Sequence, residues 1–495
     1  MPDKLQSDDD VMELLRGDVP ALSRRNFLLT AAAYALVPIT GARAQAVPLP
    51  RDADVVVVGA GAAGIAAARR IIAAGRRVIV LEASNKVGGR CQTDATSFDT
   101  PYDSGARWLH NPDSNPLVKL ARDAASEVYP APPGQKIRIG RRNARAGETE
   151  DFLATLVRAN RAIDDAGRRF LDMACERALP KDLGIWTGTI DYLLGPYANG
   201  KELKDLSVVD QFRAQDRISA LATRQGIGAL MGKLAATVPV ALSTPAQRIV
   251  WSGRDVGVET PAGRVAARAV IITASSNVLA SGALKFSPDL PKPKQESFAR
   301  LSLGNKERIA LQLTGNVFGL GRDDLFIEQS DGPRTATLYA NIAGSNLCTV
   351  DVAGAFGRDL AAQGDAAMVA FATEWLNKLF GSDVAKAIKA SRTTQWSKMP
   401  FIQGAVSAAG PGGQFARRVI AESQGSLFFA GEATHETLFG TVDGAWDSGE
   451  RAADAALKTL GALKTDAPAK AVREKKQPRR ERAPAIRSNS QQWPR

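Results

Sequence analysis

The chain has 495 residues, which allows two or three domains and a large hydrophobic core. Its net charge of +12 is no sign of nucleic-acid binding, because residues 464–495 hold ten Lys or Arg against three Asp or Glu and so carry +7 of it. Three scattered cysteines exclude a disulfide framework and a zinc cluster, and we expect no metal site.

The first 46 residues have the pattern of an export signal. A twin arginine at 24–25 precedes an apolar run at 27–40 and small residues at Ala42, Ala44 and Ala46. The run is too short to span a bilayer as a stable helix, and the A-x-A spacing suits signal cleavage. We predict export by the Tat machinery to the periplasm or beyond, with the mature chain beginning near Gln45 or Val47.

Residues 55–90 carry the strongest pattern in the chain. Four consecutive valines, Val55–Val58, predict a strand that is buried on both faces. Before a run of helix formers at 65–74, three glycines follow at G-x-G-x-x-G spacing: Gly59, Gly61 and Gly64. This order predicts a strand, a tight turn and a helix.

Each glycine of the turn has a physical role. Gly59 permits the bend, Gly61 lets a pyrophosphate approach the backbone, and Gly64 lets the helix pack closely on the strand. The first helical residues, Ala62 and Ala63, then present free N–H groups to the phosphates.

A second strand is predicted at 77–81 and ends in Glu82, which lies 23 residues after Gly59. A carboxylate at this position accepts hydrogen bonds from both ribose hydroxyls and repels a 2′-phosphate. The pattern therefore favours FAD or NAD over NADP.

With Gly88, Gly89 and Arg90 included, residues 55–90 resemble the N-terminal FAD fingerprint of the flavin-containing amine oxidases. This family includes monoamine oxidases, polyamine oxidases and histone lysine demethylases. The resemblance covers residues 54–463 in four ordered motifs and implies FAD as the cofactor. In the first motif it implies contacts with the cofactor from Glu82, Ala83, Gly89 and Arg90.

The second motif, at 103–110, contains the G-A-x-W segment that passes beside the flavin in this family. The resemblance implies four cofactor contacts there: Gly105, Ala106, Arg107 and Trp108. It also places His110 at the substrate, where a neutral imidazole orients the amine or takes its proton; a hydrogen-bonded structural role is the alternative. Arg107 could instead pair with Asp103 or with the carboxylate of an amino acid substrate.

Residues 115–220 show helical patterning, as at 152–174, without a catalytic motif, and we expect part of a substrate-binding domain there. The family pattern resumes at 226–251, where the resemblance places Ala246 on the adenine. Ala269–Thr273 predicts another buried strand.

The stretch 303–313 alternates with period two in its later half. At its start, Lys306 matches a family lysine that is linked through water to flavin N5. Its ammonium group would position the water that hydrolyses the imine, or would help dioxygen react with reduced flavin. A solvated lysine at a strand edge is the alternative, and Arg308 is a weaker candidate for the same role.

The third motif, at 396–407, matches the family in spacing and implies a cofactor contact from Trp396. Val406 stands where many amine oxidases have an aromatic wall that attracts the amine. Ala405 stands where monoamine oxidases attach FAD through a cysteine, so we expect noncovalent FAD.

The fourth motif contains Gly431 and Glu432 at the end of a predicted strand, and a helix is predicted to begin near Val442. In the family, the glutamate contacts the ribityl–phosphate region, and the helix start stabilises negative charge at flavin N1 and O2. Thr441 stands at the second aromatic position of the family, and we interpret His435 as structural.

Together these motifs predict an α/β fold with a discontinuous Rossmann-like FAD-binding domain and a substrate domain of mixed β-sheet and helices. The expected boundaries are 1–46 for the signal, 51–115, 220–291 and 401–463 for the FAD-binding domain, 116–219 and 292–400 for the substrate domain, and 464–495 for a disordered basic tail. Membrane contact is expected only through the signal or the tail, and no specific nucleic-acid partner is expected.

The leading predicted function is oxidation of a small-molecule amine at its carbon–nitrogen bond, with hydride transfer to flavin N5 and hydrolysis of the imine. Dioxygen, which would yield hydrogen peroxide, or another acceptor reoxidises the flavin. An L-amino acid oxidase is the alternative within the enzyme class. A flavin-binding redox-partner subunit without amine turnover is the alternative of another class, favoured by the missing aromatic at Val406.

Overall fold

The computed structural model describes residues 49–132, 134–169, 172–217 and 219–461. The predicted export signal and basic tail lie outside these residues. Within the described part, the strands form two large sheets and two small ones. No helix in this part is long and apolar enough to cross a membrane.

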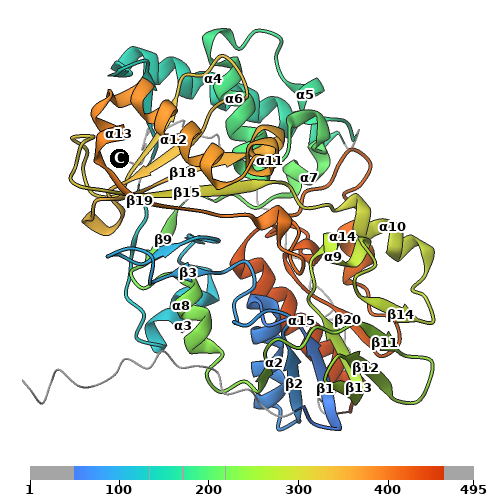
Figure 1. The fold of residues 1–495 in the computed structure, drawn as a ribbon. Coiled ribbons are helices and arrows are strands. Elements are labelled where there is room, and N and C mark those ends of the chain that lie inside the picture. Colours follow the sequence, from blue (N-terminus) through green and yellow to red (C-terminus); the bar gives the residue numbers. More distant parts are fainter. Residues whose placement is uncertain (1–48, 133, 170–171, 218, 462–495) are drawn as a thin grey trace, which may run out of the picture. The chain divides into compact units, whose positions relative to one another are not determined.

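The first large sheet has eight strands and contains the predicted nucleotide-binding stretch (Figure 1). Its strands are β1 (Asp52–Val58), β2 (Val78–Leu81), β10 (Val240–Ala241), β11 (Arg248–Val250), β12 (Val256–Thr260), β13 (Gly263–Ile272), β14 (Lys285–Ser287) and β20 (Leu427–Phe429). β10, β2, β1, β13 and β20 are parallel, whereas β12 is antiparallel to β13 and to β11. Three separate stretches of the chain build this sheet, as the sequence predicts.

Helices cover both faces of this sheet. Val55 and Val57 pack against α2 (Ala62–Ala73) and α15 (Val442–Thr459), and Val56 and Val58 belong to a second core with α9 (Ser276–Ala280), α10 (Lys292–Arg300) and α14 (Ala416–Ala421). Since successive strand residues point to opposite faces, the four valines fill both cores, as predicted. α3 (Pro116–Asp123) and α8 (Ile227–Leu234) pack beside the start of α2.

The second large sheet has seven strands in the order β19-β15-β18-β17-β16-β7-β8. They are β7 (Lys136–Ile139), β8 (Arg142–Asn143), β15 (Lys306–Leu313), β16 (Asp324–Glu328), β17 (Thr337–Ala340), β18 (Leu347–Ala353) and β19 (Ile388–Thr393). β7 and β16 are parallel and the other pairs are antiparallel, so the sheet is mixed. One face packs against α11 (Gly354–Ala362), α12 (Asp365–Phe380) and α13 (Asp383–Ala387) (Figure 1).

The alternation in β15 does not produce an exposed face, because both of its faces are covered. Ile309 and Leu311 pack against the α11–α13 helices, and Ala310 packs against Tyr102 and Trp108 on the opposite face. The pattern predicts the strand correctly, but its second face is buried by the segment that leads to His110.

The helices between 115 and 220 also differ from the expectation. The long helix α4 spans Ala146–Arg168 and not 152–174, because the Glu148 carboxylate accepts a hydrogen bond from Arg145 N and fixes the start earlier. Shorter helices follow: α5 (Cys175–Ala178), α6 (Thr187–Tyr192), the π-helix η2 (Leu193–Tyr197) and α7 (Val208–Arg213).

Two small sheets lie along the segment from Thr93 to Thr223. β3 (Thr93–Asp94) pairs with β4 (Tyr102–Asp103), and β9 (Ala220–Thr223) pairs with both β5 (Leu109–His110) and β6 (Val128–Pro130). The β5–β9 pairing places His110 opposite Ala220, which brings the chain just before β9 next to the second motif.

Candidate active site

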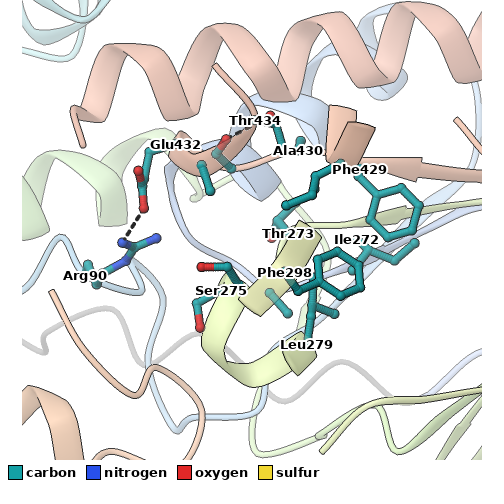
Figure 2. Close-up of a pocket in the computed structure, with 15 residues that line it drawn as sticks. Arg90, Ile272, Thr273, Ser275, Leu279, Phe298, Phe429, Ala430, Glu432 and Thr434 are labelled. Carbon is teal, nitrogen blue, oxygen red and sulfur yellow. Dashed lines mark hydrogen bonds and ion pairs between the residues drawn. The ribbon is translucent and has the colours of Figure 1, made fainter. Parts of the chain in front are cut away.

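The parallel strands of the first sheet end at one edge. β1, β2, β13 and β20 run on at this edge into Gly59, Glu82, Thr273 and Ala430. Ligands of open α/β sheets bind outside the carboxyl ends of the strands. Figure 2 shows a pocket at this edge, lined by Arg90, residues 272–276, Leu279, Phe298, Ile420 and residues 429–434.

The three glycines of the first turn show which space the protein itself fills. Gly59 has φ +101°, and a Cβ there would lie 2.6 Å from Thr273 Oγ1. A Cβ on Gly64 would overlap the carbonyl oxygen of Gly59. Gly61, however, has an ordinary extended backbone, and a Cβ on it would meet no protein atom closer than 3.9 Å. Protein packing therefore explains Gly59 and Gly64 but leaves the space at Gly61 for a ligand.

The start of α2 and the end of β2 offer groups for the two ends of such a ligand. α2 begins after Gly61 without a side-chain cap, so its first N–H groups suit phosphate. The Glu82 carboxylate accepts hydrogen bonds from Ala60 N at 2.7 Å and Ser84 N at 2.8 Å, which orients it at the sheet edge. The loop containing Ala246 lies beside it, because Thr244 N donates to Glu82 O.

Arg90 joins the first motif to the fourth. Its guanidinium lies 2.7 Å from Glu432 Oε1 (Figure 2). It also lies 2.7 Å from Ala405 O. Glu432 also accepts hydrogen bonds from Ser407 N, Ser407 Oγ and Gly440 N. Burial raises the pKa of this carboxyl, but Arg90 and the hydrogen bond from Ser407 outweigh it and hold the pKa below its ordinary value. Glu432 is therefore an ionised centre that fixes Arg90.

The G-A-x-W segment is held against Arg90 by backbone contacts. Ala106 N donates to Arg90 O at 3.0 Å, and a Cβ on Gly105 would overlap the same oxygen. Trp396 packs on Gly105 and donates from Nε1 to Ser104 O at 3.2 Å. Segments whose contacting residues lie 292 positions apart in sequence thus form one unit.

The start of α15 lies beside this unit. Gly440 N donates to Glu432, and the Thr441 hydroxyl caps the helix by accepting from Gly444 N at 3.0 Å. Val442 begins the helix and is buried. His435 accepts hydrogen bonds from Thr437 N and Leu438 N through Nδ1, which agrees with its interpretation as structural.

These features fit an FAD. Gly61 leaves room for a pyrophosphate, α2 faces its phosphates, and Glu82 is placed for a ribose. Arg90, Gly105 and the start of α15 would hold the isoalloxazine end.

Lys306 stands at the first position of β15, where the second sheet approaches this region. Its ammonium group donates to Tyr197 O at 3.2 Å and lies 4.1 Å from the centre of the Tyr197 ring. Burial, and then the nearby arginines, lower the pKa of Lys306 to about 8, although Asp351 acts in the opposite direction. The ammonium group is therefore easily deprotonated.

His110 has an imidazole that makes no hydrogen bond within the described ranges. Burial, and then the charges of Arg217 and Lys306, lower the pKa of His110 to about 4. The ring is therefore neutral at pH 7, as the sequence analysis assumes, and is available to a ligand.

Arg107 lies in the loop between β4 and β5 and contacts the second large sheet. Its Nη2 donates to Thr349 Oγ1 at 2.7 Å, and its guanidinium lies 4.4 Å from the centre of the Tyr339 ring. Asp103 instead accepts hydrogen bonds from Thr93 Oγ1 and Ile227 N, so the pairing of Arg107 with Asp103 that the sequence left open is not formed.

Arg308 has a structural role in this arrangement. It forms a two-pronged ion pair with Asp351, with N···O distances of 2.7 and 2.9 Å, and also donates to the carbonyl oxygens of Asp103 and Gly105. The pair therefore clamps the second motif onto the second sheet. The sequence had named Arg308 as a weaker alternative to Lys306.

We call the region around Arg107, His110 and Lys306 the substrate side. Sequence reasoning missed several residues there. Arg217 precedes β9, and its Nη2 donates to Phe439 O at 2.9 Å. A Cβ on Gly440 would lie 3.6 Å from both Arg217 Nη2 and Val406 Cβ, so Arg217 stands beside the empty aromatic position. Tyr197 and Tyr339 were missed as well. None belongs to a motif. The pairing of β5 with β9 shows the location of Arg217, the pairing of β17 with β18 that of Tyr339, and the contact with Lys306 that of Tyr197.

Comparisons with known proteins show the family of the chain. A family model described as flavin containing amine oxidoreductase matches residues 62–146 and 134–457. Human lysine-specific histone demethylase 2 is 27% identical over 453 residues, which cover 82% of this chain and 54% of the relative. The probable polyamine oxidase 4 of Arabidopsis thaliana is 27% identical over 443 residues, which cover 80% of this chain and 85% of the relative. The chain thus spans about half the length of the histone demethylases that it matches.

Solved structures share the fold. Cyclohexylamine oxidase from Brevibacterium oxydans IH-35A has a TM-score of 0.69 at 20% identity, covering 83% of this chain and 100% of that chain. A putrescine oxidase bound to putrescine has a TM-score of 0.71 at 19% identity, covering 82% and 99%.

Proposed function

The chain belongs to the flavin containing amine oxidoreductase family, with FAD as its cofactor, and we propose that it oxidises a small-molecule amine at the carbon–nitrogen bond. When bound, FAD supplies a two-electron acceptor that takes a hydride from the carbon beside the amine and passes the electrons to dioxygen or another acceptor. The proposal is carried by the unfilled space at Gly61 beside the uncapped start of α2, together with a neutral His110 that the charge of Lys306 reaches.

His110, Lys306 and Ala405 have separate roles in the proposed reaction. Neutral His110 accepts a hydrogen bond from the substrate amine and orients it, or takes its proton. Lys306, with a pKa near neutrality, holds a water molecule for imine hydrolysis or stabilises charge during reoxidation. Ala405, whose carbonyl oxygen binds Arg90, has no nucleophilic side chain, which supports noncovalent FAD.

Export through the twin-arginine route is part of the proposal, supported by the pattern of residues 1–46. It suits a protein that takes up FAD before it leaves the cytoplasm. Replacing both Arg24 and Arg25 with Lys should leave the protein in the cytoplasm of an expressing bacterium, and unchanged periplasmic recovery would contradict this location.

Anaerobic mixing tests the proposed oxidation. The purified FAD-loaded protein is mixed with monoamines, polyamines and L-amino acids while the absorbance of oxidised flavin is followed. Bleaching by one class is expected, and admitting air then shows whether dioxygen restores the absorbance. Bound FAD that no amine bleaches would contradict amine oxidation and favour a flavoprotein without this activity.

A further inference from the structure

Three cations on the substrate side have no carboxylate partner within the described part of the chain: Arg107, Arg217 and Lys306. Their side-chain hydrogen bonds go to the hydroxyl of Thr349 and to the carbonyl oxygens of Phe439 and Tyr197. None of these acceptors carries a charge. This group is therefore cationic, and its three side chains form no ion pair in the described part of the chain.

The nearest carboxylate cannot neutralise the group, because it is already bound. Both oxygens of Asp351 are occupied by Arg308, at 2.7 and 2.9 Å. Burial is the largest cause that lowers the pKa values of Arg107 and Lys306; Arg308 lowers both as well, and Asp351 acts in the opposite direction. Asp443 and Glu432 act on Arg217 only through space, and Glu432 is itself paired with Arg90.

Arg217 lies where an amine-binding aromatic wall is missing. A Cβ on Gly440 would meet Arg217 Nη2 and Val406 Cβ at the same distance of 3.6 Å, so the guanidinium and the valine flank one spot. Arg217 is reached by solvent, yet enough protein surrounds it for desolvation to lower its pKa. A guanidinium in such a position binds planar anions through paired hydrogen bonds.

We propose that the substrate of this oxidase is an amino acid, whose carboxylate is bound by Arg217 while Arg107 and Lys306 supply further positive potential. This inference rests on the proposed amine oxidation. A polyamine would instead bring two or more positive charges toward three unpaired cations, which is unfavourable. An aromatic surface that could offset this repulsion is absent at Val406 and Thr441.

The reaction balances with the cofactor already assigned. A hydride leaves the α-carbon and a proton leaves the amine, so the substrate loses two electrons to FAD and becomes an imino acid. Water adds to the carbon–nitrogen double bond, and ammonia and a 2-oxo acid are released. Dioxygen or another acceptor takes the two electrons from the cofactor.

Matched substrates that differ only in the carboxylate test the inference. L-Lysine is compared with 1,5-diaminopentane, L-ornithine with 1,4-diaminobutane and L-leucine with 3-methylbutylamine, and 4-aminobutyrate adds a distant carboxylate. We expect an amino acid to bleach the flavin at a concentration at least about tenfold lower than its partner does. A preference for the amines would overturn the inference but leave amine oxidation intact. Bleaching by none of them would reject both.

A binding measurement separates Arg217 from general effects on activity. Benzoate and acetate, which carry no amine, are titrated into the FAD-loaded protein while the flavin spectrum is recorded. Arg217→Gln should raise their Kd about tenfold or more, because a charge-assisted hydrogen bond is lost, and Arg217→Lys should recover part of the affinity. Arg224→Gln is the matched control, because Arg224 forms an exposed ion pair with Glu127.

Two results of this titration would overturn the inference. One is an Arg217→Gln protein that binds the carboxylates as tightly as the wild type. The other is a wild-type spectrum that neither carboxylate perturbs.

Discussion

The cofactor side and the substrate side of this site differ in whether their cations are paired with carboxylates. On the cofactor side, Arg90 is paired with Glu432, and the fully buried Arg417 is paired with Asp210 at 2.7 Å. On the substrate side, Arg308 is paired with Asp351, whereas Arg107, Arg217 and Lys306 have no carboxylate within ion-pair distance in the described part of the chain. The first region is electrostatically complete without a ligand, whereas the second carries excess positive charge.

This difference has a physical consequence. A hydrogen-bonded ion pair fixes the geometry around it, and Arg90 with Glu432 joins the four motifs. An unpaired cation costs stability, and an anionic ligand that binds beside it offsets the cost. The comparison predicts that disturbing the paired groups affects folding, while disturbing the unpaired ones affects ligands.

Asp351→Asn should have the largest effect, since it removes the carboxylate that is paired with Arg308. Arg308 would remain buried without a partner, and we expect the free energy of unfolding to fall by about 3–5 kcal/mol. Denaturant unfolding measures this loss. Asp359→Asn, which breaks only an exposed pair with Arg358, should cost less than about 1 kcal/mol. Equal losses in the two variants would contradict the assigned role of the pair.

The same pair predicts a dependence of stability on pH. Burial raises the pKa of Asp351, but the charge and hydrogen bonds of Arg308 outweigh it and hold the pKa well below its ordinary value. A lowered folded-state pKa means that the contribution is present above the unfolded-state value, about 3.9, and is lost as the pH falls through the folded-state value. Wild-type stability should therefore fall more steeply below about pH 4 than that of Asp351→Asn.

Two alanine substitutions in the first turn sharpen the comparison within the cofactor side. Gly64→Ala puts a Cβ against the Gly59 carbonyl and should destabilise the FAD-free protein by about 1–3 kcal/mol. Gly61→Ala meets no protein atom closer than 3.9 Å, so it should leave that stability nearly unchanged while weakening FAD binding at least about tenfold. Thermal unfolding and an FAD titration measure both effects. A Gly61→Ala protein that binds FAD normally would show that this space is not used by the cofactor.

The cofactor side could be predicted from the sequence because its constraints are local or carried by the backbone. Four valines, a glycine turn and a terminal Glu82 specify a strand, a bend and an acceptor within one short stretch. Gly105 and Trp396 belong to motifs whose spacing can be recognised in the sequence, although the contact between the two residues forms only in the folded protein.

The substrate side could not be predicted in the same way, because its charged groups come from separate segments. Arg217, in a stretch without a motif, meets Val406 and Gly440 only after β9 pairs with β5. The second face of β15 shows the same limit, since period two predicts a strand but not what covers it.

His110 is the neutral member of the substrate side, and its removal should affect a ligand but not the fold. His110→Ala should slow flavin reduction at least about tenfold at constant protein stability. With a pKa near 4, His110 is neutral from pH 6 to 9, so the slowing should be uniform over this range. Rapid-mixing kinetics with His110→Gln distinguishes the roles, because glutamine can orient an amine but cannot take its proton. Unchanged reduction by His110→Ala would make the residue structural.

The charge of Lys306 should have a smaller effect, which is on carboxylate affinity and depends on pH. Its pKa of about 8 reflects burial first, with Arg308, Arg107 and Arg217 lowering it and Asp351 raising it. As the pH rises through 8 the ammonium group loses its charge, so carboxylate affinity should fall by several-fold between pH 7 and 9. Benzoate does not titrate in this range, and its Kd can be followed through the flavin spectrum. Lys306→Met should bind more weakly at pH 7 and lose this pH dependence; a wild-type Kd that is constant from pH 7 to 9 would contradict the lowered pKa.

The smallest effect is expected from the neutral hydrogen bond between Trp396 and Ser104. Trp396→Phe keeps an aromatic ring near Gly105 but removes the 3.2 Å hydrogen bond from Nε1 to Ser104 O. Unfolding free energy should fall by about 1 kcal/mol, because a buried carbonyl loses one neutral donor. FAD affinity should change little, since Arg90 still holds the second motif through Ala106 N. A loss of FAD binding without a loss of stability would mean that the indole ring of Trp396 contacts the cofactor directly.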